Sequence, residues 1–202
     1  IDGMNKLNTL EYSEDKINVL TPFSNNIYKF DSINKVKVLG RYLYIGQYYF
    51  AQFSHLTSVE FNERTKLMHI PKFAFYNCTE LRKIVIPPCF IIDECAFKNC
   101  IKLKSVQFKY SKIFNLIAIQ KEAFYNCKSL KYLDFPSSVV EIGNKAFMNC
   151  VSIENITFES CEELTKIGNE AFRNCKSLID VSIPSTVTSI GKGAFENCEK
   201  LS

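Results

Sequence analysis

The five-residue motif Ala-Phe-x-Asn-Cys recurs six times between residue 74 and the C-terminus of this 202-residue chain. The copies are Ala74–Cys78, Ala96–Cys100, Ala123–Cys127, Ala146–Cys150, Ala171–Cys175 and Ala194–Cys198. The motif phenylalanine, with an earlier counterpart at Phe50, returns every 22 to 27 residues. A chain that repeats at this period folds as a stack of similar turns, each burying its apolar side against its neighbours. The motif therefore predicts a solenoid rather than a globule with one central core.

Each of the first five motifs is followed by the apolar pattern L-x-x-I-x-I, as in Leu81-Ile84-Ile86, which predicts a short strand. The two residues of I-x-I share one side of the strand, and the middle residue points to the other side. Strands of successive turns, paired in parallel about 4.8 Å apart, align these apolar residues in continuous inner rows. The expected fold is an α/β solenoid that is mostly β and irregular. It is a right-handed leucine-rich repeat superhelix with a concave parallel sheet and short helical or 3-10 turns on the other side.

The repeat units resemble one known family. Units such as Ala123–Gly143, Ala146–Gly168 and Ala171–Gly191 are similar to BspA-like (Treponema pallidum-type) leucine-rich repeats. The Asn-Cys pair resembles the variant found in protists such as Trichomonas and Entamoeba. The likeness covers residues 33–202, which we expect to form one continuous solenoid cut off at its C-terminus, with residues 1–32 as a degenerate N-terminal repeat or cap. The turns Lys109–Gln120 and Glu159–Lys166 depart from the pattern because they are longer.

Six of the nine cysteines occupy one position of the repeat and should stack as a row. A metal site needs ligands that converge on one point, and one thiol per turn does not converge. We therefore interpret the row as buried free thiols that pack as small apolar residues. Cys89, Cys95 and Cys161 lie outside the row, and the sequence leaves a Cys89–Cys95 disulfide possible. The neighbouring asparagine is expected to form a buried polar row whose amides satisfy backbone groups of the turns.

Composition and motifs exclude several classes of function. The net charge is only +4, and basic and acidic residues are mixed along the chain, so nothing indicates a nucleic-acid partner. No catalytic, phosphate-binding or metal-binding motif occurs, and we expect neither enzymatic activity nor a cofactor. His55 and His69 are interpreted as surface or turn residues. The glycosylation sequons at Asn77 and Asn155 are interpreted as chance matches, with the Asn77 side chain pointing inward.

The positions free to vary lie beside the inward-pointing strand residues, and they form the expected binding face on the concave sheet. Its candidate residues are Lys35, Lys37, Ser58, Glu60, Lys83, Val85, Ser105, Gln107, Lys131, Tyr132, Asp134, Asn155, Thr157, Asp180 and Ser182. Basic residues dominate the N-terminal part of this face, and the later part is mixed to acidic. Tyr132, an aromatic residue near the middle, is the best candidate anchor. The alternative is that exposed strand positions are polar without a binding role.

The residues favour recognition through an extended surface, and the family resemblance makes this expectation more specific. It implies the ectodomain fragment of a cell-surface or secreted adhesion protein that engages host matrix or cell-surface proteins, without inserting into the membrane itself. The alternative is an intracellular scaffold for protein–protein interaction, favoured by the free thiols, since reduced cysteines are typical of the cytosol. A weaker alternative is an enzyme regulator using the same face. The oligomeric state stays open.

Overall fold

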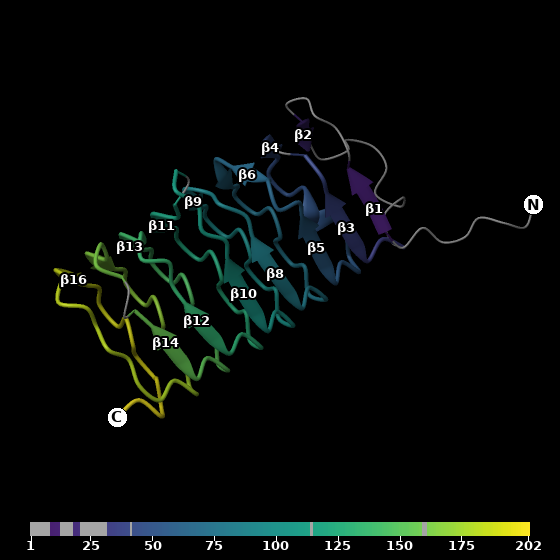
Figure 1. Cartoon of the computed structure of the whole chain (residues 1–202). Helices are drawn as coiled ribbons and strands as arrows, with labels where there is room; N and C mark the ends of the chain where they lie inside the picture. Colours follow the sequence, from purple (N-terminus) through teal and green to yellow (C-terminus); the bar gives the residue numbers. More distant parts are fainter. Residues whose placement is uncertain (1–8, 13–17, 21–31, 41, 114, 159–160) are drawn as a thin grey trace, which may run out of the picture.

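The computed structural model describes residues 9–12, 18–20, 32–40, 42–113, 115–158 and 161–202. These residues form a solenoid of short parallel strands stacked along one axis, with the N-terminal turns at one end and the C-terminal turns at the other (Figure 1). All strand pairs are parallel, and each strand pairs with its counterpart in the next turn. The expected solenoid of leucine-rich repeat type is therefore confirmed.

The strands belong to three sheets. The first has seven strands, in the order β1 (Thr9–Tyr12), β3 (Lys35–Val38), β5 (Ser58–Phe61), β8 (Lys83–Ile86), β10 (Ser105–Phe108), β12 (Tyr132–Asp134) and β14 (Asn155–Thr157). The second has six strands of two residues, β7 (His69–Ile70), β9 (Ile91–Ile92), β11 (Ala118–Ile119), β13 (Glu141–Ile142), β15 (Lys166–Ile167) and β16 (Ser189–Ile190). The third joins β2 (Asn18–Leu20), β4 (Tyr42–Ile45) and β6 (Lys66–Leu67).

The sheets continue into the region expected to cap the N-terminus. β1 pairs with β3 over four residues, and β2 pairs with β4 over three. Residues 1–8, 13–17 and 21–31 of that region lie outside the described residues. The division between a cap and the repeats at residue 33 stays a prediction.

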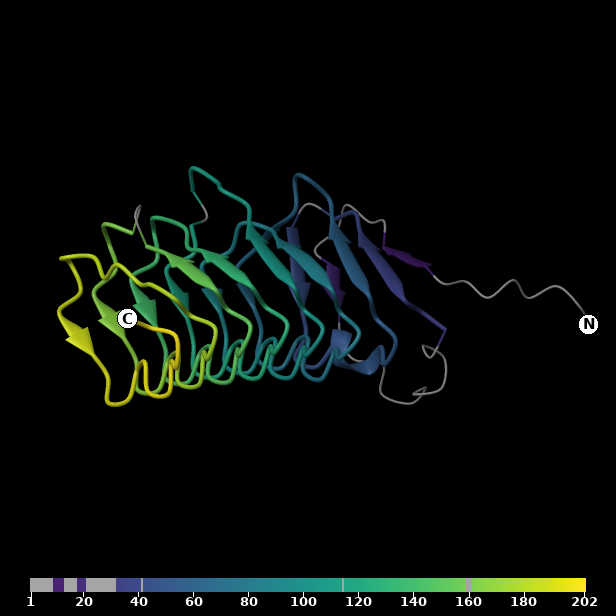
Figure 2. The same ribbon diagram turned by 90° about the horizontal axis from the view of Figure 1, so that it is seen from below.

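Aromatic stacking holds the turns together along the axis. Phe50, Phe75, Phe97, Phe124, Phe147, Phe172 and Phe195 form one column, with neighbouring ring centroids 4.5 to 5.3 Å apart and planes within 7° of parallel. The backbone fixes this spacing, because each phenylalanine N–H from Phe50 to Phe172 donates to the alanine carbonyl of the next turn, as from Phe124 to Ala146 at 2.8 Å. The column runs through a core of buried leucine, isoleucine and valine rows. Figure 2 shows the resulting regular stack of turns.

The Ala-Phe segments form turns where short helices were expected. Among the described residues the one helical element is the 3-10 helix η2 (Phe50–Gln52). The reason lies in two left-handed residues that bracket each segment, such as Phe73 (φ 60°) before Ala74 and Asn77 (φ 57°) after Tyr76. Only three residues lie between them, and a left-handed residue ends a right-handed helix. The segment is thereby limited to two overlapping turns, closed by bonds such as Tyr76 N–H to Phe73 O and Cys78 N–H to Phe75 O.

The cysteine row packs as expected and also adds hydrogen bonds. Each motif thiol donates to the phenylalanine carbonyl one turn earlier, for example Cys127 to Phe97 at 3.2 Å and Cys150 to Phe124 at 3.2 Å. These thiols are buried apart from Cys198, which is half-buried in the last turn. Burial raises the pKa of Cys127 and Cys150 well above the ordinary value, so both are held as neutral thiols.

The asparagine row differs from the expectation of buried amides bonded to turn backbone. Asn99, Asn126 and Asn149 are half-buried, and Asn77 is exposed. The amides of three of them bond to one another from turn to turn: Asn99 Nδ2 donates to Asn77 Oδ1 at 2.8 Å, and Asn126 Nδ2 donates to Asn99 Oδ1 at 2.9 Å. Asn149 Nδ2 donates instead to Tyr125 Oη at 3.2 Å. Asparagine suits this position because it tolerates the left-handed conformation that the turn requires.

Candidate binding surface

The sequence-predicted face residues lie together on one surface, and none of them is buried. We call this outer surface of β3, β5, β8, β10, β12, β14 and the bridge residue Asp180 the sheet face. Register pairs link one continuous row of it, running Lys35, Ser58, Lys83, Ser105, Tyr132, Asn155 and Asp180. The second row is paired only in parts, Lys37 with Glu60, Val85 with Gln107, and Asp134 with Thr157. The stacked repeats thus bring the variable positions together as predicted, whatever their role.

The positive charge of Lys37 on the sheet face is paired with a carboxylate that the sequence analysis did not include. Glu11 in β1 pairs in register with Lys37, and its Oε1 lies 2.9 Å from Lys37 Nζ. The hydrogen bond and charge of Glu11 raise the pKa of Lys37 above its ordinary value. Glu11 occupies the middle position of the degenerate triplet Leu10-x-Tyr12, so extending the repeat register to this triplet would have placed it on the face.

Tyr132, the predicted anchor, lies within a small polar cluster. Its side chain is 57% exposed, and its hydroxyl donates to Glu154 Oε2 at 3.3 Å. Lys131 Nζ approaches Glu154 Oε1 at 3.2 Å. The hydrogen bond and charge of Lys131 hold the pKa of the Glu154 carboxyl below its ordinary value. The exposed tyrosine ring therefore stands beside a carboxylate that stays ionised at neutral pH.

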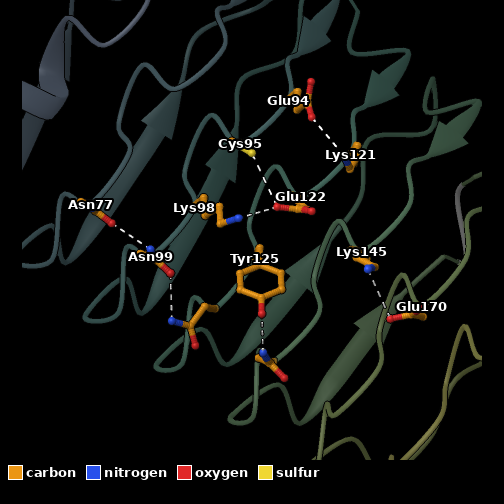
Figure 3. A network of polar contacts seen from close by, with 12 residues as sticks. Asn77, Glu94, Cys95, Lys98, Asn99, Lys121, Glu122, Tyr125, Lys145 and Glu170 are labelled. Atoms are coloured by element: carbon orange, nitrogen blue, oxygen red, sulfur yellow. Dashed lines mark hydrogen bonds and ion pairs between the residues drawn. The ribbon is translucent and has the colours of Figure 1, made fainter.

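A second polar surface, which we call the turn ridge, follows the Ala-Phe-x-Asn-Cys segments (Figure 3). Lys98 pairs with Glu122, Lys121 with Glu94 and Lys145 with Glu170, and each pair joins neighbouring turns. The further bonds there are Tyr125 Oη accepting from Asn149 Nδ2 at 3.2 Å, the asparagine ladder, and Cys95 Sγ donating to Glu122 Oε2 at 3.7 Å. Charged groups on the turn ridge are thus used to tie one turn to the next.

The cysteines outside the row, Cys89, Cys95 and Cys161, are free thiols. The Cys89–Cys95 disulfide that the sequence allowed is therefore not formed. Burial, followed by the charge of Asp93, raises the pKa of Cys89 to about 12. Burial, followed by the charge of Glu122, raises the pKa of Cys95 to about 11. Thiolate chemistry at neutral pH is disfavoured at both positions. Within the described part of the chain, no three histidine, cysteine or acidic side chains gather as a metal site would require.

His69 makes a contact that sequence reasoning did not anticipate. Its Nδ1 lies 2.7 Å from Asp93 Oδ2, and both side chains are partly exposed. The carboxylate comes from the following turn, 24 positions along the chain. Because β7 and β9 pair His69 with Ile91, the two side chains meet only once the register of the second sheet is known.

Both sequons lie at accessible positions, and the expectation of an inward Asn77 is wrong. Asn77 is exposed because its left-handed backbone turns the side chain to the turn ridge. Asn155 is exposed on the sheet face.

In the described residues, no helix is long and apolar enough to cross a membrane.

The model of the BspA-type leucine-rich repeat region matches this chain in six copies, over residues 21–115 and 92–202. No curated protein matches it. A leucine-rich cell-surface protein of Faecalibacterium prausnitzii superimposes with a TM-score of 0.61 at 23% identity, over 96% of this chain and 46% of that one. The pneumococcal vaccine antigen PcpA gives a TM-score of 0.63 at 19% identity, over 96% and 55%.

The leucine-rich repeat protein TpLRR of T. pallidum gives a TM-score of 0.52 at 22% identity, over 91% of this chain and 82% of that one. At these identities the likeness shows the fold alone. This chain spans about half the length of the Faecalibacterium and pneumococcal structures. The three structures are of bacterial proteins, and the expected closeness to protist members stays a prediction. The match to the repeat model over most of its length shows that the chain belongs to the BspA-type leucine-rich repeat family.

Proposed function

We propose that the chain is a protein-binding module, and that it forms part of the ectodomain of a cell-surface or secreted adhesion protein. In this proposal the sheet face engages matrix or cell-surface proteins of a host. The observation that carries the proposal is the continuous row from Lys35 to Asp180, where side chains of different chemistry stand in register above a uniform core. Solenoids present such rows as extended recognition surfaces.

The neighbouring proteins support the proposed location. One is described as a cell-surface protein and another as a vaccine antigen. The family's repeats support binding to protein and involve no chemistry of their own. In the proposal Tyr132 is the central anchor, because an exposed ring next to a lysine and a carboxylate offers apolar and polar contacts together.

Binding of the purified chain to immobilised collagen, laminin and fibronectin tests the proposal. The double variant Tyr132→Ala, Lys131→Glu should lower affinity at least tenfold, because truncating an interface anchor typically costs about 2 kcal/mol or more. Lys128→Glu is a control, because Lys128 is exposed outside the sheet face and its substitution makes the same change of charge as Lys131→Glu. Equal affinity of the double variant and the parent would move the interface off the sheet face. No binding to any of the three proteins would count against a matrix partner.

An intracellular scaffold is the second candidate, favoured by the nine free thiols. Thiols can be counted in protein isolated from its native source without reductant and then unfolded. Nine reactive thiols would favour the cytosol, and disulfide-linked cysteines would favour export.

A further inference from the structure

The seven-stranded sheet opens between β10 and β12. Four register pairs join β8 to β10 and three join β12 to β14, whereas the one pair between β10 and β12 is Ser105 with Tyr132. Beyond this pair each strand stays with its outer neighbour: Lys109 N–H donates to Ile86 O at 2.9 Å, and Phe135 N–H donates to Thr157 O at 3.4 Å. The two strands therefore separate at their carboxyl ends while each remains part of the sheet.

The longer turn after β10 accounts for the separation. From Phe97 to Phe124 the repeat has 27 residues, the longest spacing in the column. The turn returns to the stack where Ile117 N–H donates to Phe90 O at 2.9 Å, and Ser138 Oγ anchors it by donating to Leu116 O at 2.8 Å. Described residues of this turn, Leu116 among them, line the space between the strands.

The opening is a cavity of about 640 Å³ that is accessible from outside. Gln107 and Phe108 of β10 line it, together with Asp134 and Phe135 at the end of β12 and Leu116 from the longer turn. Phe135 and Leu116 are buried, so the deeper part of the lining is apolar. The exposed side chains of Gln107 and Asp134 add polar groups. A cavity of this size is in the range that holds a small ligand or several neighbouring side chains of a bound chain, rather than a whole folded element.

Two features select a polypeptide as the occupant. First, strand edges that separate leave main-chain N–H and C=O groups between them, and an extended chain bonds to such edges by adding a strand. Second, Asp134 and Lys109 both line the cavity, and within the described residues neither the Asp134 carboxylate nor the Lys109 ammonium is held in an ion pair. Opposite charges at one opening fit a segment that carries a basic and an acidic side chain around an apolar one.

We propose that the opening between β10 and β12 anchors an extended peptide segment of the protein partner. A large apolar side chain of the segment enters the cavity, a basic side chain faces Asp134, and an acidic side chain faces Lys109. This inference rests on the proposed protein-binding function of the sheet face and assigns the chemistry of the segment that it recognises.

An array of acetylated and amidated octapeptides tests the inference with the full chain as labelled probe. Position 4 carries Phe, Leu or Ala, and positions 2 and 6 carry Lys, Glu or Ser in all combinations. Peptides with Phe or Leu between one Lys and one Glu should bind at least tenfold more tightly than their Ala-centred counterparts. Amide exchange at residues 106–109 and 133–135 should slow when such a peptide is added. Binding that ignores position 4, or no binding by any peptide, overturns the inference.

Two variants test the assigned contacts. Gln107→Trp should obstruct the opening and abolish selective binding, whereas Ser189→Trp, at an exposed position in β16 on another sheet, is its matched control. Asp134→Lys should transfer the preference to peptides with Glu on both sides, and Glu163→Lys is the matched charge control on an exposed turn. Circular dichroism and melting temperature establish that each variant is folded. Selective binding by folded Gln107→Trp, or an unchanged charge preference in Asp134→Lys, would contradict the assignment.

The inference and the proposed function fail in different ways. If Gln107→Trp retains affinity for a matrix protein that the Tyr132→Ala, Lys131→Glu variant loses, the function stands and the cavity is not the anchor. If the peptide array shows the expected selectivity while the double variant keeps its affinity for matrix protein, the cavity binds peptide and the sheet face is not the matrix-binding surface.

Discussion

The Tyr132 hydroxyl donates a hydrogen bond to Glu154 Oε2 across neighbouring turns, at 3.3 Å. Tyr132 begins β12 and Glu154 directly precedes β14, so the parallel pairing of these two strands brings the residues together. Lys131 contacts the other oxygen of the same carboxylate, at 3.2 Å. The most exposed aromatic residue of the sheet face is thereby restrained by two polar contacts, and a restrained side chain loses less entropy when it binds.

The Glu154 carboxyl should titrate below its ordinary value of 4.5, because Lys131 stabilises the ionised form by hydrogen bond and charge. A folded-state pKa below the unfolded value means that the interaction is fully present above about pH 4.5 and is lost as pH falls through the lowered pKa. NMR titration of the side-chain carboxyl measures the midpoint. Lys131→Ala should raise the midpoint more than Tyr132→Phe, since the lysine makes the larger contribution. A larger effect of Tyr132→Phe would contradict the assigned order.

Phe147→Ala should lower the free energy of unfolding by about 3–5 kcal/mol, as is typical for a buried phenylalanine. The Phe147 ring is fully buried and stacks on Phe124 at 5.1 Å and on Phe172 at 5.3 Å. Removing it leaves a cavity between two turns and weakens the coupling between both halves of the solenoid, so the urea transition should also broaden.

Phe195→Ala is the matched control for this prediction. Phe195 is half-buried in the last turn and stacks on one neighbour, Phe172, at 5.3 Å. Its loss should cost less than half as much and leave the slope of the urea transition unchanged. Equal losses for Phe147→Ala and Phe195→Ala would mean that the column does not carry the coupling between turns.

Much of the sheet face could be predicted from the sequence because the repeat fixes the register. Once Ala-Phe-x-Asn-Cys marks the turn, the residues flanking each apolar strand position must point outward, and Lys83 or Asp180 is placed without knowledge of any distance. The interior follows in the same way, since each repeat places the same residue types in the same column.

Features that depend on backbone angles or on departures from the period could not be read in this way. The asparagine row was predicted as buried, although left-handed φ angles turn these side chains to the surface. The opening between β10 and β12 arises because the turn Lys109–Gln120 is longer, and its length alone does not tell which side it lies on. The contact of His69 with Asp93 depends on the register of two-residue strands that carry almost no sequence signal.

Gly168→Ala should destabilise the fold by about 1–3 kcal/mol, the usual cost of forcing extra volume into a packed interior. A Cβ at this position would lie 2.6 Å from the backbone nitrogen of Asn144 and from the carbonyl carbon of Gly143, and backbone cannot move aside as a flexible side chain can. Thermal unfolding followed by circular dichroism measures the loss.

Gly193→Ala is the comparison for Gly168→Ala. Gly193 has φ +65°, but the same place in the preceding turns is held by Lys145 and Glu170 with φ 57° and 54°. The row therefore accepts side chains, and alanine here should cost about 1 kcal/mol or less. A larger loss for Gly193→Ala than for Gly168→Ala would show that backbone conformation, rather than close approach of the turns, requires the glycines.

The cysteine row should resist alkylation in the native protein and should react from its C-terminal end. Alkylation by iodoacetamide needs an accessible thiolate, and burial raises the pKa of Cys150 well above its ordinary value. Cys198 is half-buried in the last turn, so it should be modified first, and Cys150 only when the solenoid opens.

Mass spectrometry of peptides after short exposures at pH 8 measures the extent of alkylation at each cysteine. The reference is the chain unfolded in guanidinium, where all nine thiols should react alike. The folded Phe147→Ala variant should expose Cys150 faster than the parent, because loss of the ring that stacks on Phe124 and Phe172 loosens the turn that holds Cys150. Alkylation of Cys150 as fast as Cys198 in the parent would contradict a row sealed by stacking.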